Sequence, residues 1–321
     1  MTRRRTGRAQ AWAELLRVSA LFSVPGDALA GAAAAGARPG RGTLCAIGAS
    51  LCLYEAGMAL NDWADRAEDA AERPHRPLPS GRIAPSAALA ASAALTAAGL
   101  ALASRAGRPS LAVATALAAT VWAYDLGLKH TPAGPGTMAT ARALDLLLGA
   151  TASTGGSGGT HRRAVHALPS AALLGAHTYA VTAVSRHETQ GGSTRTPLAA
   201  LAVTLAVAGA ASGDMLGARP ATTTVSSPSG PPAPHPHPTL PSRGLGPLLA
   251  PAYARTPATL LLHAALNPSA ALTERAVGGG IRATIPLQAA LAARAGAPGT
   301  ALALLGLVPA ARALARKVSP T

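Results

Sequence analysis

The chain has 321 residues, of which 49% are hydrophobic and only 13% are charged. Soluble domains carry roughly 25% charged residues, so this composition excludes an ordinary soluble protein and indicates a membrane protein with several spanning segments. The net charge of +15 does not predict nucleic-acid binding, because the basic residues are scattered over short connections without interleaved aromatic side chains. Positively charged cytoplasmic loops explain it better.

Apolar stretches of membrane-spanning length recur along the whole chain. Each is about as long as a helix needs to be to cross roughly 30 Å of hydrocarbon. We therefore expect residues 1–321 to form one all-α domain, a polytopic membrane bundle of about nine transmembrane helices. The expected spans are residues 13–36, 42–60, 86–105, 109–128, 135–152, 164–184, 197–218, 247–267 and 298–316, with a weaker one at 281–295.

The segments outside these spans predict topology. Residues 1–12 contain a run of arginines, and no convincing cleavage site follows, so we expect a basic cytoplasmic tail rather than a cleaved signal. The arginine-rich stretch 66–82 lies on the same side if the first two spans form a hairpin, and the positive-inside rule makes that side cytoplasmic. Residues 154–163 read as a flexible glycine-rich loop, and the proline- and serine-rich residues 221–244 as a disordered loop.

Charge is concentrated in one place, directly after the second expected span. On a helix that continues through this stretch, Asp62, Asp65 and Asp69 follow one stripe, with Asn61 on a neighbouring stripe. Stacked carboxylates repel one another, and a hard cation such as Mg²⁺, shared with a diphosphate, is their natural partner. The alternative is a solvated helix end paired with nearby arginines. Acidic residues beside a membrane favour the functional interpretation.

Several motifs resemble one family. "NDWADRAED" (61–69) matches the N-D-x-x-D-x-x-x-D signature of the UbiA superfamily of intramembrane prenyltransferases, and "RPHRPLPSGRI" (73–83) resembles its R-P-L-x-S-G-x-I loop. "YDLGLKHT" (124–131) resembles the Y-x-x-x-x-K-x-T element of the fourth helix. Residues 16–31 and 134–150 resemble the first and fifth helices. The whole chain is most similar to the EboC-like bacterial branch.

The resemblance implies a helical bundle around a central cavity in the plasma membrane. Mg²⁺ and a prenyl diphosphate would bind at its cytoplasmic end, and the prenyl group would pass to a small acceptor, often an aromatic ring. The partners implied are these two substrates and the lipid bilayer. The following residues carry the site by position: Asn61, Asp62, Asp65 and Asp69 for the metal, the three aspartates being catalytic; and Asn61, Arg76, Tyr124, Lys129 and Glu188 for the diphosphate.

The second acidic motif departs from the family pattern. The family has D-x-x-x-D in the second half, whereas "SRHETQGG" (185–192) contains Glu188 and no aspartate. Glu188 either ligates one Mg²⁺ or is an interface acid paired with Arg186. The sequence does not decide whether this degenerate segment, Ser185–Gly192, still supports catalysis.

Other polar residues within the apolar segments have open interpretations. Arg142 and Asp145 are three residues apart and either pair with each other or contact substrate. Arg282 either faces the cavity or snorkels to the interface. For His177 and Tyr179 we expect hydrogen bonds between helices.

The function predicted from these residues is that of a Mg²⁺-dependent membrane prenyltransferase. A catalytically weak UbiA-like scaffold or lipid-binding partner is the alternative. A transporter is a weaker one, because we find no inverted repeat and the charge lies at one membrane face. Prenyl chain length and acceptor identity are not determined by the sequence.

Overall fold

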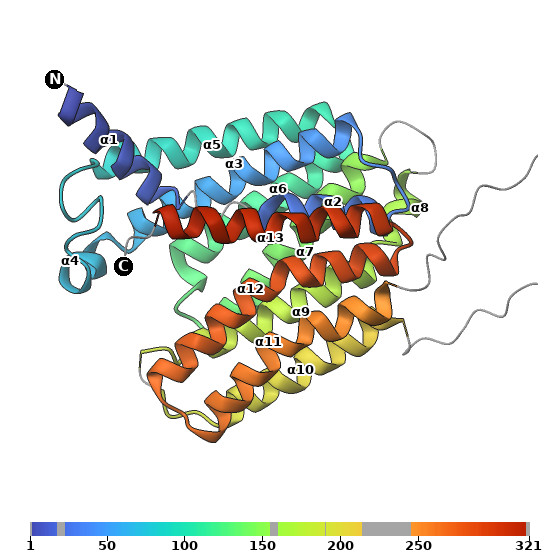
Figure 1. Ribbon diagram of the computed structural model, residues 1–321. Helices are drawn as coiled ribbons and strands as arrows, with labels where there is room; N and C mark the ends of the chain where they lie inside the picture. The colour runs from blue at the N-terminus through green and yellow to red at the C-terminus, as the bar shows by residue number, and fades with distance from the viewer. Residues whose placement is uncertain (1, 18–22, 155–159, 190, 214–244, 319–321) are drawn as a thin grey trace, which may run out of the picture.

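The computed structural model describes residues 2–17, 23–154, 160–189, 191–213 and 245–318. Every regular element among them is helical, as predicted (Figure 1). The proline- and serine-rich segment 221–244 lies outside the described residues. The elements are α1 (Thr2–Leu15), α2 (Val24–Ala34), α3 (Arg41–Ala64), α4 (Arg66–Glu72), α5 (Pro85–Arg105), α6 (Arg108–Ala123), the π-helical turn η2 (Tyr124–Leu128), α7 (Gly134–Ser153), α8 (Thr160–Val165), α9 (Leu168–Ser185), α10 (Arg195–Ser212), α11 (Gly246–Leu266), α12 (Ala270–Arg294) and α13 (Pro298–Val318).

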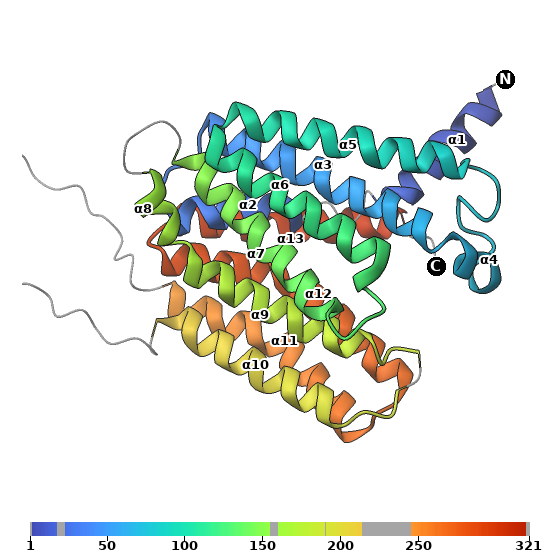
Figure 2. The ribbon, with the colours of Figure 1, turned by 180° about the vertical axis from the view of Figure 1, so that it is seen from behind.

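The long helices run along a common direction and form one bundle (Figures 1 and 2). The helices α5, α3 and α6 lie on one side, α10 and α11 on the other, and α2, α7, α9 and α12 between them. The helices α1 and α4 lie at one end of the bundle, and α8 lies at the opposite end. Among the described residues, five helical segments are long and apolar enough to cross a membrane: 41–64, 85–105, 108–128, 163–185 and 195–212. The protein is therefore an integral membrane protein.

The first expected span, 13–36, is divided into two helices. The helix α1 ends at Leu15, and α2 begins at Val24 and has only 11 residues. Pro25 lies in the first turn of α2, where its missing N–H leaves no hydrogen bond unmade. At 1.5 Å per residue, α2 extends for about 16 Å, roughly half the thickness of the hydrocarbon.

Two further expectations differ in their limits. The weaker span 281–295 is part of the much longer α12, which begins at Ala270 after the side chain of Ser269 caps it by accepting from Leu272 N at 3.4 Å. The glycine-rich segment 154–163 is not wholly a loop, because α8 begins at Thr160. Its residues 155–159 lie outside the described part of the chain.

Small residues allow α2 to pack closely on α7. A Cβ at Gly149 would overlap the backbone of Ala28, and one at Gly31 would overlap the carbonyl oxygen of Leu146. Close approach of this kind replaces the hydrophobic driving force that is absent between helices in lipid. It holds the start of α2 beside the middle of α7, where a buried polar cluster lies.

Candidate active site at one end of the bundle

A cavity of ≈ 550 Å³ lies inside the bundle, with walls from α3, α6, η2, α7, α9 and α12. Three predicted site residues line it: Asn61, Tyr124 and Glu188. The other five do not contribute to its lining and lie beyond its end, close to α4: Asp62, Asp65, Asp69, Arg76 and Lys129. The cavity and the acidic motif are thus adjoining parts of one site.

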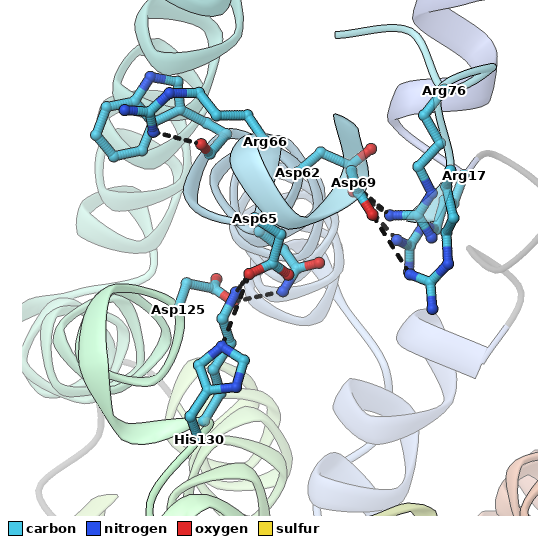
Figure 3. A network of polar contacts seen from close by, with 12 residues as sticks. Arg17, Asp62, Asp65, Arg66, Asp69, Arg76, Asp125 and His130 are labelled. Carbon is cyan, nitrogen blue, oxygen red and sulfur yellow. Dashed lines mark hydrogen bonds and ion pairs between the residues drawn. The ribbon is translucent and has the colours of Figure 1, made fainter. Parts of the chain in front are cut away.

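The acidic motif does not lie on one continuous helix, contrary to the prediction. The helix α3 ends at Ala64, Asp65 joins it to the seven-residue α4, and the carboxylates are distributed over both helices. Asp62 and Asp69 are buried, at 5% and 2% exposure, whereas Asp65 is half-buried. The break turns the stripe into two groups of carboxylates that point in different directions (Figure 3).

Asp62 and Asp69 form the first group, with arginines around them. Nη1 of Arg76 lies 2.7 Å from Oδ2 of Asp69 and 3.6 Å from Oδ1 of Asp62. Nη1 of Arg73 lies 3.4 Å from Oδ1 of Asp69, and Nη2 of Arg17 donates to Oδ1 of Asp62 at 3.1 Å. One guanidinium nitrogen therefore reaches both carboxylates, so their oxygens converge on a single position (Figure 3).

Asp65 belongs to the second group. Its carboxylate forms an ion pair with Lys129, and Nε2 of His130 lies 3.8 Å from Oδ1. Asp65, Glu68 and His130 also offer ligand atoms that all lie within 4.8 Å of one another. Lys129 is held in place through its backbone, because Nη1 of Arg186 donates to the carbonyls of Lys129 at 3.3 Å and Thr131 at 2.6 Å.

The π-helical turn η2 brings two consecutive residues into the cavity wall. Tyr124 and Asp125 both line the cavity, which the wider π turn permits and which is common at functional sites. Nδ2 of Asn61 donates to Oδ1 of Asp125 at 3.2 Å. This bond orients the amide of Asn61 through its nitrogen and leaves its oxygen available to another partner. Sequence reasoning missed Asp125, although it adjoins Tyr124 in "YDLGLKHT".

Arg17 is a second residue that sequence reasoning missed. Its guanidinium lines the cavity and contacts Asp62. Its backbone has a positive φ of 47°, the one such non-glycine residue among those described, and this left-handed conformation is uncommon and strained for a bulky side chain. The end of α1, three residues before Arg17, is anchored to the segment after α4, because Glu14 accepts two hydrogen bonds from Arg82, at 2.7 and 3.0 Å. This anchor helps to position Arg17. The signal in the sequence is a single arginine at the start of an apolar stretch.

Glu188 lies at the same end of the cavity, on the opposite wall. Within the described residues it forms no ion pair, and Arg186 donates to carbonyls instead, so the predicted alternative of an Arg186–Glu188 pair is wrong. Burial raises the pKa of Glu188, and the nearby carboxylate of Glu274 in α12 raises that pKa further. Glu274 thus brings a second acid close to this degenerate motif, from a helix distant in sequence.

The deeper polar residues pair differently from one expectation. Arg142 pairs with Asp27 of α2, with Nη1 2.8 Å from Oδ2. Asp145 accepts a hydrogen bond from Ser50. A direct ion pair between Arg142 and Asp145 is not among those found in the described residues, since α2 supplies the partner that the sequence could not reveal.

His177 connects three helices, as predicted. Because a carbonyl can only accept, Nε2 of His177 donates to the oxygen of Gly280 at 3.1 Å, and Nδ1 accepts from the hydroxyl of Tyr253 at 2.9 Å. Tyr179 is 49% exposed, and no hydrogen bond from it to another helix is found among the described residues. Arg282 is exposed and does not contribute to the cavity wall.

Comparison with known proteins identifies the family. Residues 21–213 match the UbiA prenyltransferase family, and this match includes α2 to α10 and all eight predicted site residues. The chain belongs to the UbiA prenyltransferase family.

Two curated relatives of this UbiA-family chain are digeranylgeranylglyceryl phosphate synthases. That of Methanopyrus kandleri is 32% identical over 128 residues, which cover 38% of this chain and 45% of the relative. That of Korarchaeum cryptofilum is 33% identical over 126 residues, which cover 39% and 44%. The matched region is thus less than half the length of each relative. The narrower resemblance to the EboC-like branch stays a prediction.

Two solved structures share the fold. The UbiA homolog from Aeropyrum pernix K1, without ligand, is 18% identical with a TM-score of 0.61, covering 84% of this chain and 96% of that one. A structure from a study of digeranylgeranylglyceryl phosphate synthase in membranes is 15% identical with a TM-score of 0.59, covering 91% of this chain and 99% of that one.

The donor atoms of this UbiA-family site fit a divalent cation. Carboxylate and amide oxygens are the ligands that Mg²⁺ prefers, and Mg²⁺ takes one or two carboxylates besides water and phosphate. Asp62 and Asp69 converge on the position of one cationic nitrogen, and Asn61 presents its amide oxygen close by in the chain. Asp65 points toward Lys129 instead, so a cation shared by all four predicted ligands requires Asp65 to leave that pair.

Proposed function

We propose that this protein is a Mg²⁺-dependent prenyltransferase that moves a prenyl group from a prenyl diphosphate to a small acceptor. The observation that carries the proposal is the junction of two environments. Buried carboxylates and the cations paired with them lie at one end of a cavity whose middle wall is mostly apolar. A molecule with a multiply charged head and an apolar tail is complementary to both.

The proposed donor complex begins with an exchange of partners. A diphosphate at the end of the cavity would attract Arg76 and Lys129, which otherwise neutralise Asp69 and Asp65. The carboxylates so released would then hold Mg²⁺ together with Asn61. Tyr124, on the cavity wall, would donate its hydroxyl to a phosphate oxygen. The net charge of the site changes little, because each anion keeps a cation throughout.

The chemistry follows from where charge develops. As the allylic carbon–oxygen bond breaks, negative charge grows on the leaving diphosphate, and cationic side chains positioned beforehand stabilise it. Mg²⁺, when bound, supplies further stabilisation of the same charge. The apolar side chains below the site exclude water, which would otherwise capture the allylic cation before the acceptor does.

The proposed acceptor is a small nucleophile, and its chemical class is not fixed further. The family resemblance supports an aromatic ring. The names of the two curated relatives support a glyceryl phosphate. Transfer assays with one acceptor of each kind would distinguish the two classes.

We further propose a plasma-membrane location with the site on the cytoplasmic side. Support comes from the arginines of residues 1–17 and 66–82, which gather at the end of the bundle occupied by α1 and α4 (Figure 1). Membrane-impermeant labelling of intact cells tests this, with single cysteines introduced at Arg66 and, at the opposite end of the bundle where α6 begins, at the exposed Arg108. Labelling from outside at Arg66 would contradict the orientation.

The decisive experiment measures binding of labelled prenyl diphosphates to the purified protein, with and without Mg²⁺. Asp65→Ala and Asp69→Ala are the test variants, and Glu72→Gln, an exposed acid on α4, is the matched control. Binding that needs Mg²⁺ and both aspartates supports the proposal. No binding by the wild-type protein would favour the scaffold alternative, for which the pairing of all three motif aspartates with the protein's own cations is the supporting observation.

A further inference from the structure

The cavity is polar at both ends and mostly apolar between them. Asn61 and Asp125 mark the end near the acidic motif, and Ser50, Arg142 and Asp145 mark the deep end. Ser50 and Asn61 belong to the same helix, α3, so at 1.5 Å per residue the two ends are separated by about 16 Å. The wall between them is mostly apolar, with a few hydroxyl groups from Tyr54, Thr178 and Thr182. Its apolar residues are Leu53, Gly57, Met58, Leu117, Val121, Val181 and Val277.

The deep end is a rigid polar floor. Arg142 is fixed by its ion pair with Asp27, at 2.8 Å, and Asp27 is fully buried behind it. Gln288, also fully buried, supports Asp27 by donating to its Oδ1 at 2.7 Å and to the carbonyl of Ser23 at 2.8 Å. Because α2 begins at this level, its first turn closes the floor from one side.

A prenyl chain in this cavity meets the floor at a definite length. An extended carbon chain advances about 1.2 Å per bond, as an extended peptide does, so an isoprene unit of four main-chain bonds spans about 5 Å. Three units therefore reach from Asn61 to Ser50. A longer chain would press apolar carbon against Arg142 and Asp145. It would displace water or other polar groups from these side chains without replacing their hydrogen bonds, which costs free energy.

We propose that Ser50, Arg142 and Asp145 form a polar floor that limits the donor to about three isoprene units, the length of a farnesyl group. This inference rests on the proposed function, since it concerns the tail of the same donor. It assigns a specificity role to buried charges that lie too far from the diphosphate end to take part in the chemistry.

The test is a length series with defined probes. Dimethylallyl, geranyl, farnesyl and geranylgeranyl diphosphates are each titrated into the purified full-length protein with Mg²⁺. For the wild-type protein we expect affinity to rise as far as farnesyl diphosphate and to fall about tenfold for geranylgeranyl diphosphate. Equal affinity for these two would overturn the floor, because the chain would then leave the cavity beside Ile281, which lines it and is 61% exposed.

A substitution should move the limit. Ala141 lines the cavity one helical turn before Asp145, so Ala141→Leu raises the floor by about 5 Å and should shift the optimum from farnesyl to geranyl diphosphate. Ala141→Val, a smaller intrusion, should weaken farnesyl binding in the same direction and serves if the leucine variant does not fold. Thr140→Leu changes the neighbouring, exposed position and should leave the optimum unchanged.

The two proposals fail in different ways. If no donor of any length binds with Mg²⁺, the proposed function falls and the floor falls with it. If donors bind but the length profile is flat in the wild-type protein, or unmoved in both Ala141 variants, the floor alone is overturned.

Discussion

Arg76 places one guanidinium nitrogen 2.7 Å from Oδ2 of Asp69 and thereby occupies the point on which the buried carboxylates of Asp69 and Asp62 converge. A metal cation held by these two carboxylates would need the point that the guanidinium of Arg76 occupies, so the two cations exclude each other. Arg76→Ala should therefore have opposite effects on two ligands: Mg²⁺ alone binds more tightly, and a prenyl diphosphate with Mg²⁺ binds at least about tenfold more weakly. Calorimetric titration measures both.

The control for this prediction is another arginine of the same segment. Arg66 lies over the ring of Trp63 at 4.6 Å and donates to its carbonyl, away from the carboxylates (Figure 3). Arg66→Ala should change neither affinity. If Arg76→Ala weakens Mg²⁺ binding in the absence of donor, the interpretation of Arg76 as a competitor for the metal position is wrong.

Asp125 should matter although no motif singled it out. It orients the amide of Asn61, and outer-shell partners of metal ligands typically contribute about 10–100-fold to metal affinity. Asp125→Ala should weaken Mg²⁺-dependent donor binding by about tenfold or more, and Asp125→Asn should lose less, because its side-chain oxygen can still accept from Asn61. A binding isotherm for Asp125→Ala that superimposes on the wild-type one would remove Asp125 from the site.

Donor binding should depend on pH through Glu188. Its pKa is raised by burial and by Glu274, so Glu188 takes up a proton at a higher pH than an ordinary glutamate, whose pKa is 4.5. If ionised Glu188 helps to hold the cation, affinity should fall as pH decreases through this raised pKa. Glu274→Gln should move the fall to lower pH, and Glu188→Gln should abolish it.

The raised pKa of Glu188 affects the stability of the fold in the opposite direction from donor binding: lowering the pH favours the fold and disfavours binding. A carboxyl with a raised pKa in the folded state binds its proton more tightly there than in the unfolded state, so its contribution to stability is present at low pH and is lost as pH rises through the folded-state pKa. Thermal unfolding of the wild-type protein and Glu188→Gln across this range measures it. A pH profile of donor binding that is identical in the wild-type protein, Glu188→Gln and Glu274→Gln would contradict a role for Glu188 in binding.

Tyr253 should stabilise the fold through His177. Tyr253 is fully buried, and its hydroxyl donates to Nδ1 of His177. Tyr253→Phe leaves that nitrogen without its donor and should lower the free energy of unfolding by about 1 kcal/mol. Tyr179→Phe, at an exposed position on the same helix as His177, should change it little. Denaturant unfolding in detergent compares the two, and equal losses would contradict the structural role assigned to His177.

Helix positions were predictable because they depend on local sequence. The expected spans 86–105 and 135–152 agree closely with α5 (Pro85–Arg105) and α7 (Gly134–Ser153), since runs of apolar residues bounded by proline, glycine or charge have few other solutions in a membrane. The error in the span 13–36 came from treating hydropathy as continuous. A proline at position 25 begins a new helix there.

The sequence by itself determined the family and the helical class and located the acidic motif, because each of these depends on neighbouring residues. Only the tertiary structure decided which cation neutralises which acid. Arg17 reaches Asp62, Lys129 reaches Asp65, and Arg142 reaches Asp27 rather than Asp145. These partners are brought together by helix packing, and in a membrane interior a buried charge must find such a partner wherever the fold places one.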